Sequence, residues 1–133
     1  MTIERINPEG LRRPPTYTPV VRATGGSTAY LSGQVPVDID GRTVGEGDFA
    51  AQAQQVFANL RVALAAVGAD FSHVVKMTTY IVNYRPELRE VLGTIRTEAM
   101  GDALPASTLV GVQALAMPGY MIEVEAVAVI DRD

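Results

Sequence analysis

The sequence contains no cysteine, no tryptophan and a single histidine, and these absences remove several classes of chemistry. Without cysteine, the chain has no disulfides, no thiolate nucleophile and no cysteine-ligated metal. The one histidine, His73, lies between a predicted helix and a predicted strand and has no metal-ligating or triad partner nearby in sequence. We therefore interpret it as a solvated loop residue, not as a catalytic base, and we predict no metal site.

Long apolar runs and clusters of basic residues are also missing. No apolar stretch is long enough to span a membrane, and the N-terminus lacks the charged-then-apolar pattern of a secretory signal. Net charge is −4, and Arg12-Arg13 is the only adjacent basic pair, which argues against nucleic acid as a partner. By elimination, we expect a cytoplasmic protein that binds neither nucleic acid nor membranes.

The composition that remains is that of one folded domain. The chain has 133 residues, of which 47% are apolar and 20% charged, and this predicts a single domain over residues 1–133. A chain of this size has little interior relative to its surface, yet its mean hydropathy is +0.14. A subunit interface would take up the excess apolar surface, so we expect a small homo-oligomer.

Apolar periodicity and turn signals predict an α+β domain with the element order ββαβαββ. Asp48 is a good helix N-cap, Gly68 predicts the end of the same helix, and Pro86 suits the first turn of a second one. After an arm at 1–19, we expect strands at 20–24 and 29–35 paired as a hairpin, a helix at 49–67, a strand at 74–82, a helix from 86 to near 101, and strands at 108–115 and 121–130.

The last predicted strand has two different faces. Its even-numbered residues are apolar, whereas Glu123 and Glu125 share the other face with two valines. Two helices can cover only one face of a mixed sheet, so the other face must meet something else. We expect the apolar face of 121–130 and the segment 106–115 to be buried against neighbouring subunits. The glutamates fit two readings equally well, a water-facing edge strand or a cleft carboxylate that moves protons.

Two short motifs resemble ligand-binding loops but do not match the full patterns. The run Asp38-Ile39-Asp40-Gly41 resembles the start of a calcium loop, but the glycine comes too early after the first aspartate and no bidentate glutamate ends the loop, so we predict a plain turn. Gly25-Gly26 lacks the dinucleotide-binding pattern and precedes a strand, so it is not a phosphate-binding loop.

Several segments taken in order are more specific than any single motif. They are Tyr17 after the Pro-rich arm, Ser32-Gly33-Gln34-Val35-Pro36-Val37, Ala51-Gln52-Ala53 with Asn59-Leu60, Val74-Val75-Lys76, Pro105-Ala106-Ser107-Thr108 and Ile122-Glu123-Val124-Glu125-Ala126. Over nearly the whole chain, this series resembles the reactive intermediate deaminase family (RidA/YjgF, also labelled L-PSP endoribonuclease).

The resemblance implies a chorismate-mutase-like (YjgF-like) α+β fold with two helices on one face of a mixed sheet. It also implies a homotrimer in which three sheets form a central barrel, with pockets between subunits. Active members of the family hydrolyse enamines or imines, such as 2-aminoacrylate, to a keto acid and ammonia. They need no cofactor.

By position, Glu123 matches the family's pocket glutamate, which handles the water and the protons. The residues that match substrate-binding positions are Tyr17, Ser32, Gly33, Glu90, Ser107 and Leu109. Ser107 stands where typical members carry an arginine, and Glu90 stands at the position of a pocket asparagine. A serine offers one neutral donor where an arginine offers two charge-assisted hydrogen bonds, so 2-aminoacrylate should be held poorly.

The resemblance, with serine at position 107, therefore implies a deaminase (hydrolase) of a small enamine or imine metabolite other than 2-aminoacrylate. The alternative is a non-enzymatic trimer that binds a small metabolite in the same pockets. Endoribonuclease activity ranks third, because the chain has no histidine pair, acidic metal cluster or basic groove to support it.

Overall fold

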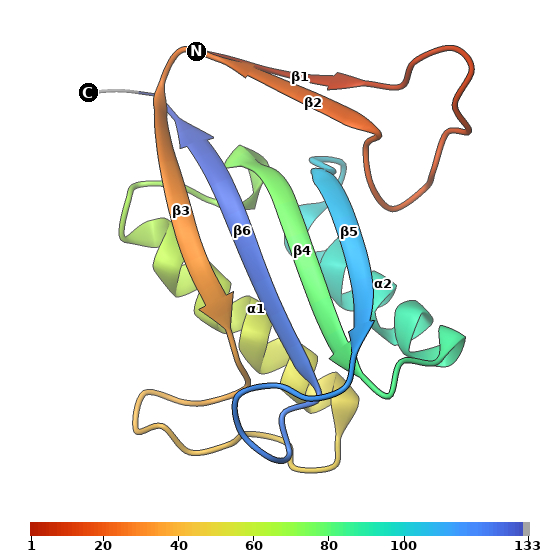
Figure 1. Ribbon diagram of the computed structural model, residues 1–133. Helices are drawn as coiled ribbons and strands as arrows, with labels where there is room; N and C mark the ends of the chain where they lie inside the picture. Colours follow the sequence, from red (N-terminus) through yellow and green to blue (C-terminus); the bar gives the residue numbers. More distant parts are fainter. Residues whose placement is uncertain (132–133) are drawn as a thin grey trace.

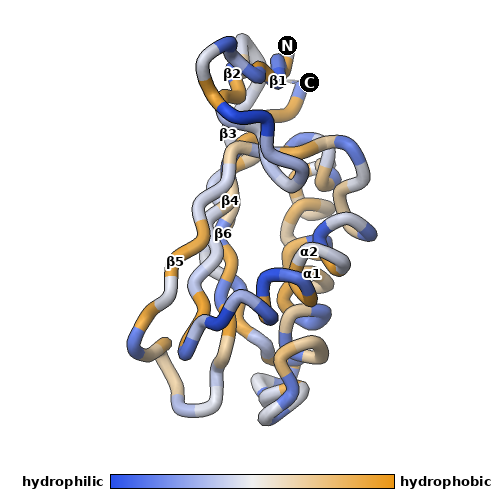
Figure 2. Tube along the Cα trace, turned by 90° about the vertical axis from the view of Figure 1, so that its right-hand side faces the viewer, coloured by the Kyte–Doolittle hydropathy of each residue, from blue (hydrophilic) through white to orange (hydrophobic). Residues whose placement is uncertain are grey.

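The computed structural model describes residues 1–131, which form an α+β domain built on a four-stranded sheet. Its strands run in the order β3-β6-β4-β5, with β4 and β5 parallel and the other neighbours antiparallel. The strands are β3 (Ser27–Gln34), β4 (Val74–Val82), β5 (Ala106–Val112) and β6 (Ile122–Ile130), and the helices are α1 (Phe49–Ala65) and α2 (Pro86–Met100). Both helices lie on the same face of the sheet, as Figures 1 and 2 show.

The two helices begin where the sequence predicted. The Asp48 side chain accepts a hydrogen bond from the backbone N–H of Ala51, which caps α1, and Pro86 occupies the first turn of α2. Helix α1 ends at Ala65, two residues earlier than predicted, and Gly68 follows in the left-handed conformation. The existence and type of these elements are confirmed, with small shifts at their ends.

The predicted hairpin of strands 20–24 and 29–35 is wrong. Strand β2 (Val20–Thr24) pairs with β1 (Thr2–Ile6) in a separate two-stranded sheet, whereas β3 pairs with β6. Gly25 and Gly26 both have positive φ, and a side chain at Gly26 would overlap the Ile130 carbonyl oxygen at the end of β6. The double glycine therefore lets the chain leave one sheet and enter the other, and it does not close a hairpin.

The hydrophobic core lies between the sheet and the helices. Even-numbered residues of β6, Ile122 to Ala128, are buried there against apolar side chains of α1 and α2. This face is covered within the chain, so the expectation that neighbouring subunits bury it is wrong. The opposite face carries Glu123, Glu125 and Tyr30, which is 82% exposed, and neither helix covers this face. No helix in that part of the chain has the length and apolarity to cross a membrane.

Candidate functional site

Glu123 lies directly against the backbone of Gly33. The two residues come from neighbouring strands, β6 and β3. A Cβ added at Gly33 would overlap the Glu123 carboxylate, at 2.8 Å from Cδ and 3.0 Å from Cγ. Any side chain at position 33 would therefore push the carboxylate away, and the glycine holds room for it.

An irregularity in the strand pairing creates this contact. Leu31 faces Ala126 and Gln34 faces Val124, so β3 advances by one residue more than β6 between these pairs. Ser32 and Gly33 lie within this β-bulge, and the Gln34 side-chain amide donates to the Ser32 carbonyl at 3.1 Å. Bulges often re-aim side chains beside functional sites, and this one brings the Gly33 backbone against a half-buried carboxylate.

Other polar groups share the open face with Glu123. Tyr80 of β4 is the register partner of Glu123, and its hydroxyl donates a hydrogen bond to the Glu125 carboxylate. That hydrogen bond, together with partial desolvation and the nearby carboxylate charges, raises the pKa of the Tyr80 phenol. Further along the same face, Lys76 Nζ donates to Thr108 Oγ1 at 2.9 Å. Glu125 is thus engaged by Tyr80, whereas no protein hydrogen bond within residues 1–131 engages the Glu123 carboxylate.

A cavity of about 800 Å³ lies on the helix side of the molecule. It is lined by the N-terminal arm, by one side of α2, and by Ser107 and Leu109 of β5. Tyr17 and Glu90 line it as well, from the arm and from α2. Its size and its mixture of apolar and polar walls are typical of small-molecule sites.

Backbone contacts fix the arm that closes this cavity. Thr18 is buried, its hydroxyl donates to the Leu104 carbonyl at 2.6 Å, and its N–H donates to the Pro105 carbonyl at 3.0 Å. These bonds tie the arm to the connection between α2 and β5. They place Tyr17 at the cavity wall, although residues 7–19, which follow β1 in the arm, have no regular secondary structure.

The structure divides the seven predicted site residues into two groups. Tyr17, Glu90, Ser107 and Leu109 line the cavity. Ser32, Gly33 and Glu123 do not line it, and Glu123 lies on the opposite face of the sheet. Within one chain the predicted proton-transfer group and the predicted substrate pocket are therefore apart.

Of the α2 residues that line the cavity, only Glu90 was predicted from the sequence, and two of the others stand out. Arg96 is only 9% exposed, and Gly93 sits in mid-helix, where an added Cβ would meet nothing within 4 Å. Arg96 follows Leu92 by four residues, so it occupies a position that the helical periodicity reserves for an apolar side chain. A charged residue at an apolar helical position was the sequence signal that could have identified Arg96 as a site residue.

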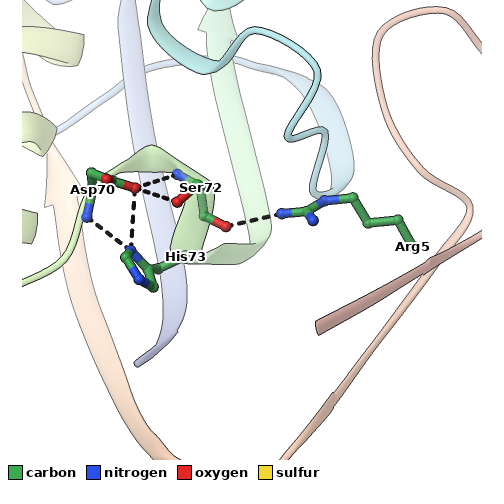
Figure 3. A network of polar contacts seen from close by, with 4 residues as sticks. All are labelled: Arg5, Asp70, Ser72 and His73. Atoms are coloured by element: carbon green, nitrogen blue, oxygen red, sulfur yellow. Dashed lines mark hydrogen bonds and ion pairs between the residues drawn. The ribbon is translucent and has the colours of Figure 1, made fainter. Parts of the chain in front are cut away.

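His73 has a structural role in a short 3-10 turn, η1 (Phe71–His73), shown in Figure 3. Its Nδ1 accepts from the Asp70 N–H at 3.1 Å, while the Asp70 carboxylate accepts from the Ser72 N–H and hydroxyl. The Ser72 hydrogen bonds lower the pKa of Asp70. The ring is half-buried and caps the turn, so the interpretation as a solvated loop histidine is only partly correct.

The run from Asp38 to Gly41 forms a turn, as predicted. Asp38 Oδ1 accepts from the backbone N–H groups of Asp40 and Arg42, and the Gly41 N–H donates to the Asp38 carbonyl. The carboxylate is thus used to close its own loop.

Comparisons with known proteins converge on one family. The family model described as Endoribonuclease L-PSP matches residues 11–130. Protein DfrA of Myxococcus xanthus is 39% identical over 115 residues, 85% of this chain and 84% of that protein. The 2-iminobutanoate/2-iminopropanoate deaminase of Dermatophagoides farinae is 32% identical over 108 residues, 80% of each chain. The solved structure of YyfB from Yersinia pestis, a Rid-family protein of unknown function, superposes with a TM-score of 0.90 at 37% identity, covering 98% of this chain and all of that one.

Proposed function

Because the chain belongs to the Endoribonuclease L-PSP family, which includes the Rid proteins, we propose that it hydrolyses a small enamine or imine metabolite to a carbonyl compound and ammonia. The Dermatophagoides farinae relative, named for the deamination of 2-iminobutanoate and 2-iminopropanoate, supports this reaction class. The observation that carries the proposal is the half-buried Glu123 carboxylate, which lies against the Gly33 backbone and has no protein hydrogen bond within residues 1–131.

A carboxylate in this position suits imine hydrolysis. The enamine first tautomerises to the imine, so a proton must be added at carbon and removed from nitrogen. Water then adds to the C=N carbon, and the resulting carbinolamine loses ammonia to leave a C=O group. In our proposal Glu123 accepts the proton of the attacking water and returns it to the departing nitrogen. The absence of a side chain at Gly33 leaves room for the carboxylate in this position.

We further propose that the site is composite. Glu123 and Gly33 lie on the open face of the sheet, whereas Tyr17, Glu90, Ser107 and Leu109 line the cavity on the helix side. A homotrimer that packs the open sheet faces toward a common axis would let the Glu123 of one subunit approach the cavity of its neighbour. The exposure of Tyr30 on the open face supports such a contact, because a large aromatic side chain there would be buried on assembly.

We propose a substrate larger than 2-aminoacrylate. A three-carbon enamino acid fills only a small part of a cavity of about 800 Å³. Ser107, at the cavity wall, offers a single neutral donor, which could not replace a bidentate arginine at that position.

The test is a panel of imines generated in situ, of increasing chain length, with ammonia release as the readout. Wild-type protein should hydrolyse longer imines faster than 2-aminoacrylate. Glu123→Gln keeps the shape and removes the titrating group, so it should abolish turnover and leave the oligomer intact by light scattering. Glu125→Gln is the matched control on the same face and should retain most of the activity.

If no imine in the panel is hydrolysed by the wild-type protein, the hydrolase proposal fails. Saturable binding of the corresponding keto acids would then favour a metabolite-binding protein that uses the same cavity.

A further inference from the structure

Arg96 is a buried guanidinium without an anionic partner at the wall of the cavity. Its residue is 9% exposed, and no ion pair within residues 1–131 includes it. Its single hydrogen bond, from Nη2 to the Thr16 carbonyl, is long at 3.3 Å. The Nε atom is fully buried and has no partner. An arginine is rarely buried unless it is paired, because desolvation of its charge is costly.

The acidic groups nearby do not compensate for this cost. Glu90 and Glu98 line the same cavity, but both are exposed and neither comes within ion-pair distance of Arg96. Burial lowers the pKa of the Arg96 guanidinium, as expected for a desolvated cation, yet an arginine stays protonated at neutral pH. The chain thus keeps a positive charge inside the cavity wall with no counter-charge of its own.

Part of the guanidinium remains available to a ligand. Nη1 makes no hydrogen bond within the described residues and is not among their fully buried polar atoms, so it keeps some exposed surface in a residue that lines the cavity. The only bond that Arg96 makes is to the arm that forms the opposite wall, and a 3.3 Å bond to a neutral carbonyl is readily exchanged for a charged acceptor. Gly93, one turn earlier on α2, leaves open space beside it.

We propose that Arg96 binds the carboxylate of the ligand in this cavity. The ligand class is then a small organic acid, oriented with its anionic end toward α2 and its apolar part toward Leu109 of β5. The expectation that a carboxylate is held poorly because Ser107 replaces an arginine gives way to one in which Arg96 of α2 holds the carboxylate. The binding of an organic acid by Arg96 does not depend on the proposed function. Only the identification of that acid as an imino acid, or as the keto-acid product, rests on it.

The test is calorimetric titration with 4-methyl-2-oxopentanoate and with its neutral primary amide, which differ in charge but hardly in shape. Wild-type protein should bind the acid at least about tenfold more tightly than the amide, because a charge-assisted contact is at stake. Arg96→Met should lose that preference, whereas Arg96→Lys should keep part of it. Arg89→Met removes an exposed arginine from the rim of the same cavity and should weaken binding by no more than about threefold.

Thermal unfolding and light scattering of the same variants exclude a purely structural role. Replacing an unpaired buried charge by an apolar side chain is neutral or stabilising, so Arg96→Met should keep or raise Tm and retain the wild-type assembly. Equal binding of acid and amide by the wild type, undiminished acid binding by Arg96→Met, or dissociation of that variant into monomers would each overturn the inference. In the last case the guanidinium would be pairing with a neighbouring subunit.

The inference and the proposed function fail separately. A protein that binds the acid through Arg96 but hydrolyses no imine refutes only the hydrolase. A protein that hydrolyses neutral imines and does not distinguish acid from amide refutes only the role of Arg96.

Discussion

Gly33 and Glu123 occupy adjoining strands so closely that the carboxylate fills the space where a side chain at position 33 would lie. Gly33 does not have a positive φ, so alanine is compatible with the backbone there. The obstacle is the terminal part of a flexible side chain, which can move at little cost to folding. The contact therefore matters for where the carboxylate points more than for stability.

We predict that Gly33→Ala reduces kcat/KM by roughly ten- to a hundredfold, because misplacing a catalytic group by about 1 Å has effects of this size. Tm should change by only a few degrees. Steady-state kinetics and differential scanning calorimetry check the two parts. Full activity in Gly33→Ala would mean that the position of the Glu123 carboxylate is unimportant.

Gly93 differs from Gly33, because a side chain added at Gly93 would enter open space in the cavity. Gly93→Ala should stabilise the protein by about 0.5–1 kcal/mol, since a mid-helix glycine is less favourable than alanine. Gly93→Phe should fill the cavity and block binding of keto acids while the fold persists. Chemical denaturation measures the first effect and calorimetric titration the second. Undiminished binding by Gly93→Phe would place the ligand elsewhere.

Ser107 tests the relation between the cavity and substrate size. Ser107→Arg adds a second guanidinium at the β5 wall and should improve hydrolysis of 2-aminoacrylate by roughly ten- to a hundredfold, the equivalent of 1.5–3 kcal/mol for a charge-assisted contact. Longer imines should lose activity, because the new side chain takes up cavity volume. Ser107→Gln, of similar length but neutral, is the control. If it improves 2-aminoacrylate hydrolysis as much as arginine does, charge is not the cause.

Asp70 gives a prediction about pH. Its folded pKa is lowered, chiefly by the Ser72 hydroxyl hydrogen bond, so its carboxylate stabilises the fold above the ordinary pKa and loses that effect as pH falls through the folded pKa. Asp70→Asn should therefore destabilise the protein most at neutral pH, and the loss should shrink as the pH falls below the ordinary carboxyl pKa and through the lowered pKa of folded Asp70. The group is largely exposed, so the loss should stay below about 1 kcal/mol. Urea unfolding at fixed protein concentration at neutral and at acidic pH measures it, and a loss that grows on acidification would have the wrong sign.

Local sequence signals predicted most of the fold. Asp48 and Pro86 marked the starts of both helices, and the alternation in 121–130 gave the two faces of β6. The pairing of the strands could not be predicted from such local signals. Gly25-Gly26 looks like a hairpin turn, and only the approach of Gly26 to the end of β6 makes the chain change sheets.

The candidate site was predictable residue by residue but not as an arrangement. Glu123 stood out as a carboxylate in an apolar strand, and Tyr17 and Ser107 were found by resemblance. Their separation onto two sides of the sheet depends on strand order and on the path of the arm, which no local pattern encodes. Arg96 was missed although its spacing of four residues from Leu92 put it on the apolar side of α2, because only the packed structure shows that this side also lines a cavity.

A composite site predicts a specific behaviour when two inactive variants are mixed. Glu123→Gln retains an intact cavity, and Gly93→Phe retains an intact carboxylate. If each site combines the Glu123 of one subunit with the cavity of another, mixed oligomers contain sites in which both halves are intact.

The most direct test of the account is to unfold these two variants together, refold them as an equal mixture and measure imine hydrolysis. Each variant alone should be inactive. Random assembly into a trimer should restore up to about a quarter of wild-type activity, because one site in four then receives both intact halves. A mixture that stays as inactive as its components, although it forms mixed oligomers, would contradict a site shared between Glu123 and a neighbouring cavity.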